Sequence, residues 1–215
     1  MAKASIGKKP DDFTLPATGE KDISLSDLKG KNVVIYFYPK DSTPGCTREG
    51  QDFRDNIRKF RSRKTIVLGV SRDSIKSHEN FKEKQEFPFD LLSDKDEKLC
   101  KQFDVIKEKN MYGKKHMGIE RSTFLIDAKG VLRQEWRKVK VDGHVNEVLD
   151  AIPAKRITFS EGCFVELGVD FQNENFQWKK FTQPYMSNGT SLPDLIEEGY
   201  TTEINVQSIA WIKSL

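Results

Sequence analysis

KNVVIYFYPKDSTPGCTRE, residues 31–49, contains a strand, a turn and the start of a helix in direct succession. Its first eight residues are a continuous β-prone run, which is typical of a strand covered on both faces of a sheet. The run ends at Pro39, and a polar turn closes with TPG at residues 43–45. Apolar side chains then recur at helical spacing. We therefore predict a buried strand that leads through this turn into a helix over residues 47–62, with Cys46 where the helix begins.

Further predicted strands and helices alternate through the rest of the first 153 residues. The predicted strands are 65–70, 90–92, 122–127 and 131–136, and the predicted helices are 74–85, 96–103 and 143–152. Residues 107–115 (KEKNMYGKK) are interpreted as an exposed connection. The last two strands are joined by AKG, a hairpin signal. This order predicts an α/β domain with a central mixed sheet flanked by helices, and its closing antiparallel hairpin is typical of a thioredoxin-like fold.

The C-terminal segment has a different composition. The formal charge changes from +6 over residues 1–153 to −3 over residues 154–215. We place a domain boundary there, and predict that residues 154–215 form a small β-rich appendage of unknown role. Its predicted strands are 157–159, 164–171, 176–181 and 204–212. With only 62 residues it is near the lower limit for independent folding.

The totals exclude several classes of function. A net charge of +3 over 215 residues is too small to indicate nucleic acid as a partner. The longest apolar run, residues 33–38, is far too short for a membrane span. The N-terminal residues lack the apolar stretch of a secretion signal, so we expect a cytoplasmic protein. Three widely spaced cysteines and three scattered histidines fit neither a disulfide framework nor a metal site. We therefore expect no metal and no cofactor.

Cys46 is the main candidate for chemistry. The thiolate is the nucleophilic form of cysteine, and the N–H groups and dipole of a helix N-terminus stabilise an anion. Making a thiol substantially ionised at neutral pH requires roughly 3 kcal/mol, and a helix end supplies at most about 2. A nearby guanidinium is the natural source of the rest. The alternative interpretation is that Cys46 is a small buried core residue.

The motif Pro39-x-x-x-Thr43-x-x-Cys46 resembles the active-site motif of the peroxiredoxins. The fuller YFYPKDSTPGCTRE is similar to the bacterioferritin comigratory protein (peroxiredoxin Q) branch. The similarity continues through GVSRDS, LLSDKDEKLCKQFDV and GIERSTFLIDAKGVLRQEW, and covers residues 3–152.

The resemblance implies roles for four residues. Cys46 would be the peroxidatic cysteine, which attacks a peroxide oxygen and becomes a sulfenic acid. Thr43 would hydrogen-bond the thiolate and the peroxide, and Pro39 would shield the sulfur. Arg121 would steady the thiolate and orient the peroxide, which supplies the guanidinium that the energetic argument requires.

The sequence departs from the family at the resolving cysteine. The two positions where relatives carry it are Gln51 and Lys82 here. Either Cys100 resolves the sulfenic acid after local unfolding, or an outside thiol reduces it directly. The alternative for Cys100 is a packed helix residue. Cys163, in the C-terminal segment, is interpreted as a β-core residue. A role as the resolving cysteine is its less favoured alternative.

Two functions follow from this interpretation. The first is a peroxidase that reduces hydrogen peroxide and organic hydroperoxides and is recycled by thioredoxin or a similar thiol donor, as a monomer or weak dimer. The second is a redox-sensing module that uses oxidation of Cys46 as a switch. The two functions differ in turnover.

Overall fold

A computed structural model describes residues 3–111, 114–153, 155–156, 167–168, 200–201 and 203–204. The chain divides into two units, Met1–Ala151 and Ile152–Leu215. Among its described residues, the second unit has two pairs of short strands. They are β10 (Lys155–Arg156) parallel to β12 (Tyr200–Thr201), and β11 (Leu167–Gly168) antiparallel to β13 (Glu203–Ile204). The predicted strands 157–159 and 176–181 lie outside the described residues, as does most of 164–171 and 204–212.

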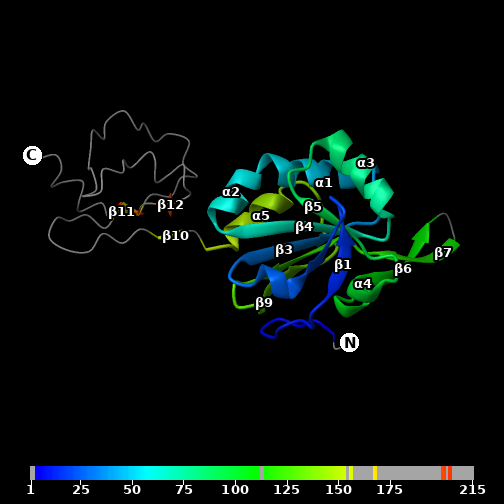
Figure 1. Ribbon diagram of the computed structural model, residues 1–215, viewed down its shortest axis with the longest axis horizontal. Coiled ribbons are helices and arrows are strands. Elements are labelled where there is room, and N and C mark those ends of the chain that lie inside the picture. Colours follow the sequence, from blue (N-terminus) through cyan, green and yellow to red (C-terminus); the bar gives the residue numbers. More distant parts are fainter. Residues whose placement is uncertain are drawn as a thin grey trace, which may run out of the picture. The chain divides into compact units, whose positions relative to one another are not determined.

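The first unit is built on a seven-stranded mixed sheet (Figure 1). Its strands are β1 (Thr14–Ala17), β2 (Lys21–Ser24), β3 (Asn32–Phe37), β4 (Thr65–Ser71), β5 (Asp90–Ser93), β8 (Ser122–Ile126) and β9 (Leu132–Trp136). The spatial order is β2-β1-β5-β4-β3-β8-β9. The three central strands β5, β4 and β3 are parallel, and the strands on either side are antiparallel to their neighbours. The predicted central mixed sheet is confirmed.

Helices cover both faces of this sheet. One face carries α1 (Pro44–Asp55), α2 (Ile57–Ser62), α3 (Ile75–Gln85) and α5 (His144–Asp150), and the opposite face carries α4 (Lys98–Gln102) (Figure 1). Strand β3 shows why two layers form, because successive side chains of a strand point to opposite faces. Tyr36 stacks on Phe53 of α1, with ring centroids 4.7 Å apart. Its neighbour Phe37 packs against Phe103 at the end of α4, at 5.5 Å.

Two predictions from the sequence are wrong in detail. The helix predicted over residues 47–62 is two helices, because the chain leaves helical geometry at Asn56 between α1 and α2. Within the connection predicted at residues 107–115, the described residues instead belong to two antiparallel strands, β6 (Ile106–Met111) and β7 (Lys114–Ile119). These strands carry many charged residues and have low intrinsic β-propensity, so cross-strand pairing decides their structure. The Glu108–Lys115 ion pair at 3.0 Å is one such contact.

A short 3-10 turn (Leu25–Leu28) follows β2. Over the part of the chain that the structure describes, no helix has the length and apolarity that a membrane crossing requires.

Candidate active site

The candidate site is built around the first turn of α1. Thr43 is the N-cap residue with extended backbone angles, and Pro44 occupies the first helical position, where its missing N–H costs nothing. Cys46 therefore lies in the first turn, where free N–H groups and the helix dipole favour an anion. Its side chain is buried, with 2% exposed. The predicted placement of Cys46 at a helix start is confirmed.

Arg121 is brought to Cys46 by the register of the sheet. Strands β3 and β8 are antiparallel with Phe37 opposite Ser122, so Arg121, one residue earlier, lies where β3 leads into the turn before α1. Its Nη2 donates to Cys46 Sγ at 3.3 Å. Gly45 leaves room for this contact, because a Cβ atom there would lie only 3.2 Å from Nη2. A residue 75 positions away thus supplies the cation beside the sulfur.

Glu49 is the part of the site that the sequence prediction missed. It lies three residues after Cys46, on the same side of α1, and its carboxylate pairs with Nη1 of Arg121. The carboxylate is almost completely buried. Burial raises the pKa of Glu49 to about 7, although the charge and hydrogen bond of Arg121 act in the opposite direction. The guanidinium therefore bridges a buried carboxyl group and the candidate nucleophile.

The charge on Arg121 is secured by these neighbours. Burial lowers the pKa of Arg121, but the charges of Glu49 and Cys46 and their hydrogen bonds outweigh it and raise the pKa overall. The site therefore holds a permanent positive charge with a fixed fork of donors, one aimed at the sulfur.

Thr43 and Pro39 lie in the turn that precedes α1. The Thr43 hydroxyl donates to the carbonyl of Lys40 at 3.1 Å and does not cap the helix. Its lone pairs remain available to accept a hydrogen bond, and it does not occupy the N–H groups of the first turn. Pro39 is half-buried where β3 ends. The roles predicted for both residues stay predictions.

The positions of the missing resolving cysteines are filled by polar contacts. Gln51 on α1 donates from its amide to Oε1 of Gln85 on α3 at 2.8 Å. Lys82 on α3 forms an ion pair with Asp90 of β5 at 2.8 Å. Both contacts join α3 to a neighbouring element, so these two residues stabilise the folded arrangement around the site.

Cys100, the other candidate for resolving, lies in a different environment. It is fully buried on α4, among the apolar residues of the core. Burial raises the pKa of the Cys100 thiol well above its usual range, and the charge and hydrogen bonding of Asp94 raise it further. A neutral thiol of this kind is a poor nucleophile.

The sheet separates the two cysteines. Cys46 is on α1, which packs on the face that carries Tyr36, whereas Cys100 is on α4, which packs on the face that carries Phe37. A disulfide requires Cα atoms within about 7 Å of each other. A bond between the two sulfurs would therefore require more than fraying of one helix. Cys163 lies outside the described residues.

Within the described ranges, no group of three or more histidine, cysteine or carboxylate side chains is placed to hold a metal ion.

Comparison with known proteins identifies the class of protein. Residues 6–135 match the model of the AhpC/TSA family, which is more than half of the chain. The chain belongs to this family, as the sequence motifs predicted.

Curated relatives specify the branch. The chain is 54% identical over 144 residues to a putative peroxiredoxin bcp of Coxiella burnetii, which covers 67% of this chain and 95% of the relative. It is 57% identical over 143 residues to peroxiredoxin Bcp of Xanthomonas campestris, covering 66% and 89%. It is 52% identical over 147 residues to peroxiredoxin Bcp of Bacillus subtilis, covering 68% and 94%. The predicted similarity to the bacterioferritin comigratory protein branch is confirmed.

Solved structures show the same fold. The bacterioferritin comigratory protein of X. campestris, in a study of its alkyl peroxide reduction activity, is 56% identical with a TM-score of 0.63, covering 65% of this chain and 89% of that one. A PrxQ variant of Xylella fastidiosa is 47% identical with a TM-score of 0.66, covering 70% and 96%. The thioredoxin-like peroxiredoxin fold of the first unit is thereby confirmed.

The C-terminal segment matches something else. Residues 140–215 match the model of a family described as putative S-adenosyl-L-methionine-dependent methyltransferase. This match covers 76 of the 215 residues, less than half of the chain, so it does not change the family assignment. It begins shortly before helix α5. Sequence reasoning had found no resemblance for this segment.

Proposed function

We propose that this chain is a one-cysteine thiol peroxidase in which Cys46 reduces hydrogen peroxide and organic hydroperoxides. The observation that carries the proposal is the contact of Arg121 Nη2 with Cys46 Sγ at 3.3 Å, in the first turn of a helix. Family membership and the alkyl peroxide reduction of the X. campestris relative support the choice of substrate.

The first half-reaction is a displacement at oxygen. The Cys46 thiolate attacks the protonated oxygen of the hydroperoxide, so that an S–O bond forms while the O–O bond breaks. The sulfur is oxidised by two electrons to a sulfenic acid, and the peroxide is reduced. The leaving hydroxide or alkoxide takes a proton from solvent and departs as water or an alcohol.

Arg121 and the helix terminus would supply electrostatic stabilisation. Negative charge moves from the sulfur to the leaving oxygen, and donors already fixed beside this path stabilise the stretched O–O bond without reorganising. Arg121 is held in advance by Glu49. The Thr43 hydroxyl, whose own proton is donated to Lys40, would accept a hydrogen bond from the hydroperoxide. Pro39 would limit access of water.

The second half-reaction would use an outside thiol. Such a thiol attacks the sulfenic acid, releases water and leaves a mixed disulfide on Cys46, and a second thiol frees Cys46 and departs as a disulfide. Three observations favour this over an internal disulfide: Gln51 and Lys82 replace the family's resolving cysteines, Cys100 lies across the sheet, and burial together with Asp94 raises the pKa of its thiol. We propose thioredoxin or a similar thiol donor as the reductant, and the reducing cytoplasm as the compartment.

Turnover with different reductants tests the proposal. The full chain is mixed with excess hydrogen peroxide and with dithiothreitol, glutathione or a thioredoxin system, and peroxide loss is followed. We expect many equivalents to be consumed with at least one reductant, and no consumption above background by a Cys46→Ser variant. Consumption of one equivalent per chain under every reductant would contradict the proposal and favour a redox switch instead.

A further inference from the structure

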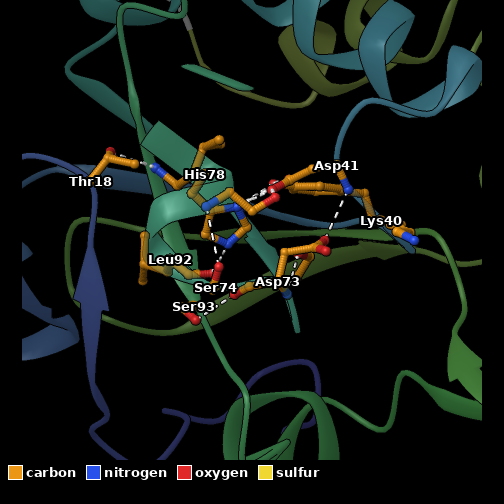
Figure 2. Close-up of polar contacts among 12 residues, drawn as sticks. Thr18, Lys40, Asp41, Asp73, Ser74, His78, Leu92 and Ser93 are labelled. Carbon is orange, nitrogen blue, oxygen red and sulfur yellow. Dashed lines mark hydrogen bonds and ion pairs between the residues drawn. The ribbon is translucent and has the colours of Figure 1, made fainter. Parts of the chain in front are cut away.

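A second buried polar cluster lies beside the candidate site, centred on Asp41 and His78 (Figure 2). Asp41 is in the turn after β3, and His78 is on α3; they are 6% and 0% exposed. The carboxylate of Asp41 is fully engaged. One oxygen accepts from the Tyr38 hydroxyl at 2.7 Å, and the other accepts from the Ser77 hydroxyl at 2.7 Å and from Nδ1 of His78 at 2.9 Å.

His78 joins the turn at Asp41 to the centre of the sheet. Burial raises the pKa of Asp41, but the hydrogen bond and electrostatic effect of His78 and the hydrogen bonds of Ser77 and Tyr38 together lower it overall, so the group is a carboxylate. A carboxylate only accepts, so Nδ1 must donate to it. The other ring nitrogen faces the carbonyl of Leu92 on β5 at 3.1 Å, and a carbonyl also only accepts. Each ring nitrogen of His78 therefore faces an acceptor, one in the turn and one on strand β5.

This pair is attached to the turn that leads into α1. Asp41 is fixed through its main chain as well, because its N–H donates to Asp73 at 2.9 Å (Figure 2). The next residue, Ser42, has a φ of +58°, in the left-handed region, which is unfavourable for a residue other than glycine. Thr43, the N-cap residue of α1, follows directly. The turn therefore has an unfavourable backbone conformation at Ser42, between the buried side chain of Asp41 and the start of helix α1.

His78, the partner of Asp41, is held by regular secondary structure. His78 lies in α3, where its N–H donates to the Ser74 carbonyl at 2.9 Å, and its ring is fixed to β5 in the parallel centre of the sheet. Asp41 is thus connected through the His78 ring to a strand that does not belong to the site. Removing either donor of the ring leaves a buried acceptor without its hydrogen bond.

We propose that His78 is a positioning residue for peroxide reduction, which acts through Asp41 to hold the turn 39–43 in the conformation that places Cys46 against Arg121. The inference rests on the proposed role of Cys46 as the nucleophile. His78 itself touches neither the sulfur nor the substrate in this scheme.

Two substitutions of His78 separate its two contacts. In His78→Asn the amide nitrogen takes the place of Nδ1 and can still donate to Asp41. In His78→Gln it takes the place of Nε2, so it can donate to Leu92 but not to the turn. The second-order rate constant for oxidation of Cys46 by hydrogen peroxide is measured in single turnover, on full-length chains whose folded fraction is matched by circular dichroism. We expect a loss of about 10- to 100-fold in His78→Gln, as for a small misplacement of reacting groups, and rescue close to the wild-type rate in His78→Asn.

The comparison between these variants decides the inference. A merely structural role would lower the stability of both and leave their rates alike, and equal rates in the two variants would overturn the proposal. If His78→Gln does not fold, Asp41→Ala replaces it, because it removes the acceptor for Nδ1 and leaves His78 in place; we expect the same loss, and a wild-type rate would overturn the proposal. A Cys46→Ser chain is assayed alongside. If it still consumes peroxide, the proposed function itself fails, whereas an inactive Cys46→Ser with a fully active His78→Gln rejects the positioning role alone.

Discussion

Cys46 and Cys100 are both buried free thiols on helices that pack against one sheet, yet groups of opposite charge lie beside them. Arg121 donates to the sulfur of Cys46, whereas the carboxylate of Asp94 accepts the N–H of Cys100 at 2.7 Å and disfavours its thiolate. Burial and helix position do not distinguish the two thiols, since both are buried and each is the third residue of its helix. The sign of the nearest charge differs, and it is the basis for predicting that Cys46 reacts and that Cys100 does not.

The two environments also differ in how they are built. Cys46 depends on long-range placement, since the sheet register brings Arg121 to the start of α1. Cys100 depends on local packing, since Leu99 and Phe103 lie with it in the apolar core. The face of the sheet that carries Cys46 should therefore be sensitive to substitutions that change a charge. The face that carries Cys100 should be sensitive to substitutions that change the volume of a side chain.

The largest expected difference is between the two cysteine-to-serine variants. Cys46→Ser should lose at least about a thousandfold in peroxide reduction, because the nucleophile is removed. Cys100→Ser should keep the wild-type rate, because its sulfur takes no part. Peroxide consumption with dithiothreitol as reductant measures both. Loss of activity in the folded Cys100→Ser variant would break the contrast between the two thiols.

Removing the guanidinium should have the next largest effect. Arg121→Met is expected to slow oxidation of Cys46 about 100-fold, the usual cost of one preorganised donor. Arg121→Lys should recover only part of the rate, since an ammonium cannot contact Glu49 and Cys46 in the same fork. Stopped-flow oxidation by hydrogen peroxide gives the rates. Arg48→Met, on the exposed side of the same helix and paired with Asp142, is the matched control and should be unaffected.

A smaller effect is expected at Thr43. Thr43→Val should slow peroxide reduction about tenfold, which corresponds to one hydrogen bond, while Thr43→Ser keeps the hydroxyl and should remain near the wild-type rate. The same stopped-flow assay applies. Equal rates for Val and Ser would show that the hydroxyl serves only the turn, through its bond to Lys40.

The last prediction concerns the pH dependence of stability at Glu49 and not a reaction rate. Its folded-state pKa of about 7 lies above the ordinary value of 4.5, so the folded chain retains a proton that the unfolded chain releases. This stabilisation is present at low pH and is lost as the pH rises through 7. Between pH 5 and 8 the free energy of unfolding should fall by up to about 3 kcal/mol from this group. Urea unfolding measures it.

Glu49→Gln should remove that part of the pH dependence. Glu83→Gln, an exposed position on α3, is the control and should retain the wild-type slope. A Glu49→Gln variant with an unchanged slope would show that Arg121 keeps the carboxylate ionised throughout this pH range.

Much of the fold and the centre of the site follow from local sequence. The apolar runs of β3 and β4 identify the middle of the sheet, and Pro39 and Pro44 fix where the turn lies, so Cys46 could be placed at a helix start. Arg121 could be assigned only through the resemblance, since an arginine before a strand has no local signature. The sheet register supplies the physical reason for its role.

Other features depend on distant partners and could not be predicted. A glutamate on a helix is usually exposed, whereas Glu49 is buried and pairs with Arg121, which lies just before β8. Its spacing of three residues from Cys46 was the one available signal. Strands β6 and β7 are polar and form through cross-strand pairing. Asp41 and His78 are 37 residues apart, and neither has a pattern that indicates a buried hydrogen bond.

The central claim is tested most directly by locating the first product of oxidation. The full chain is treated with one equivalent of hydrogen peroxide in the presence of a sulfenic-acid trap, and the trapped product is mapped by mass spectrometry of peptides. The account predicts the adduct on Cys46 alone, with Cys100 recovered as a free thiol. An adduct on Cys100, or a disulfide between Cys46 and Cys100 in place of the adduct, would contradict it.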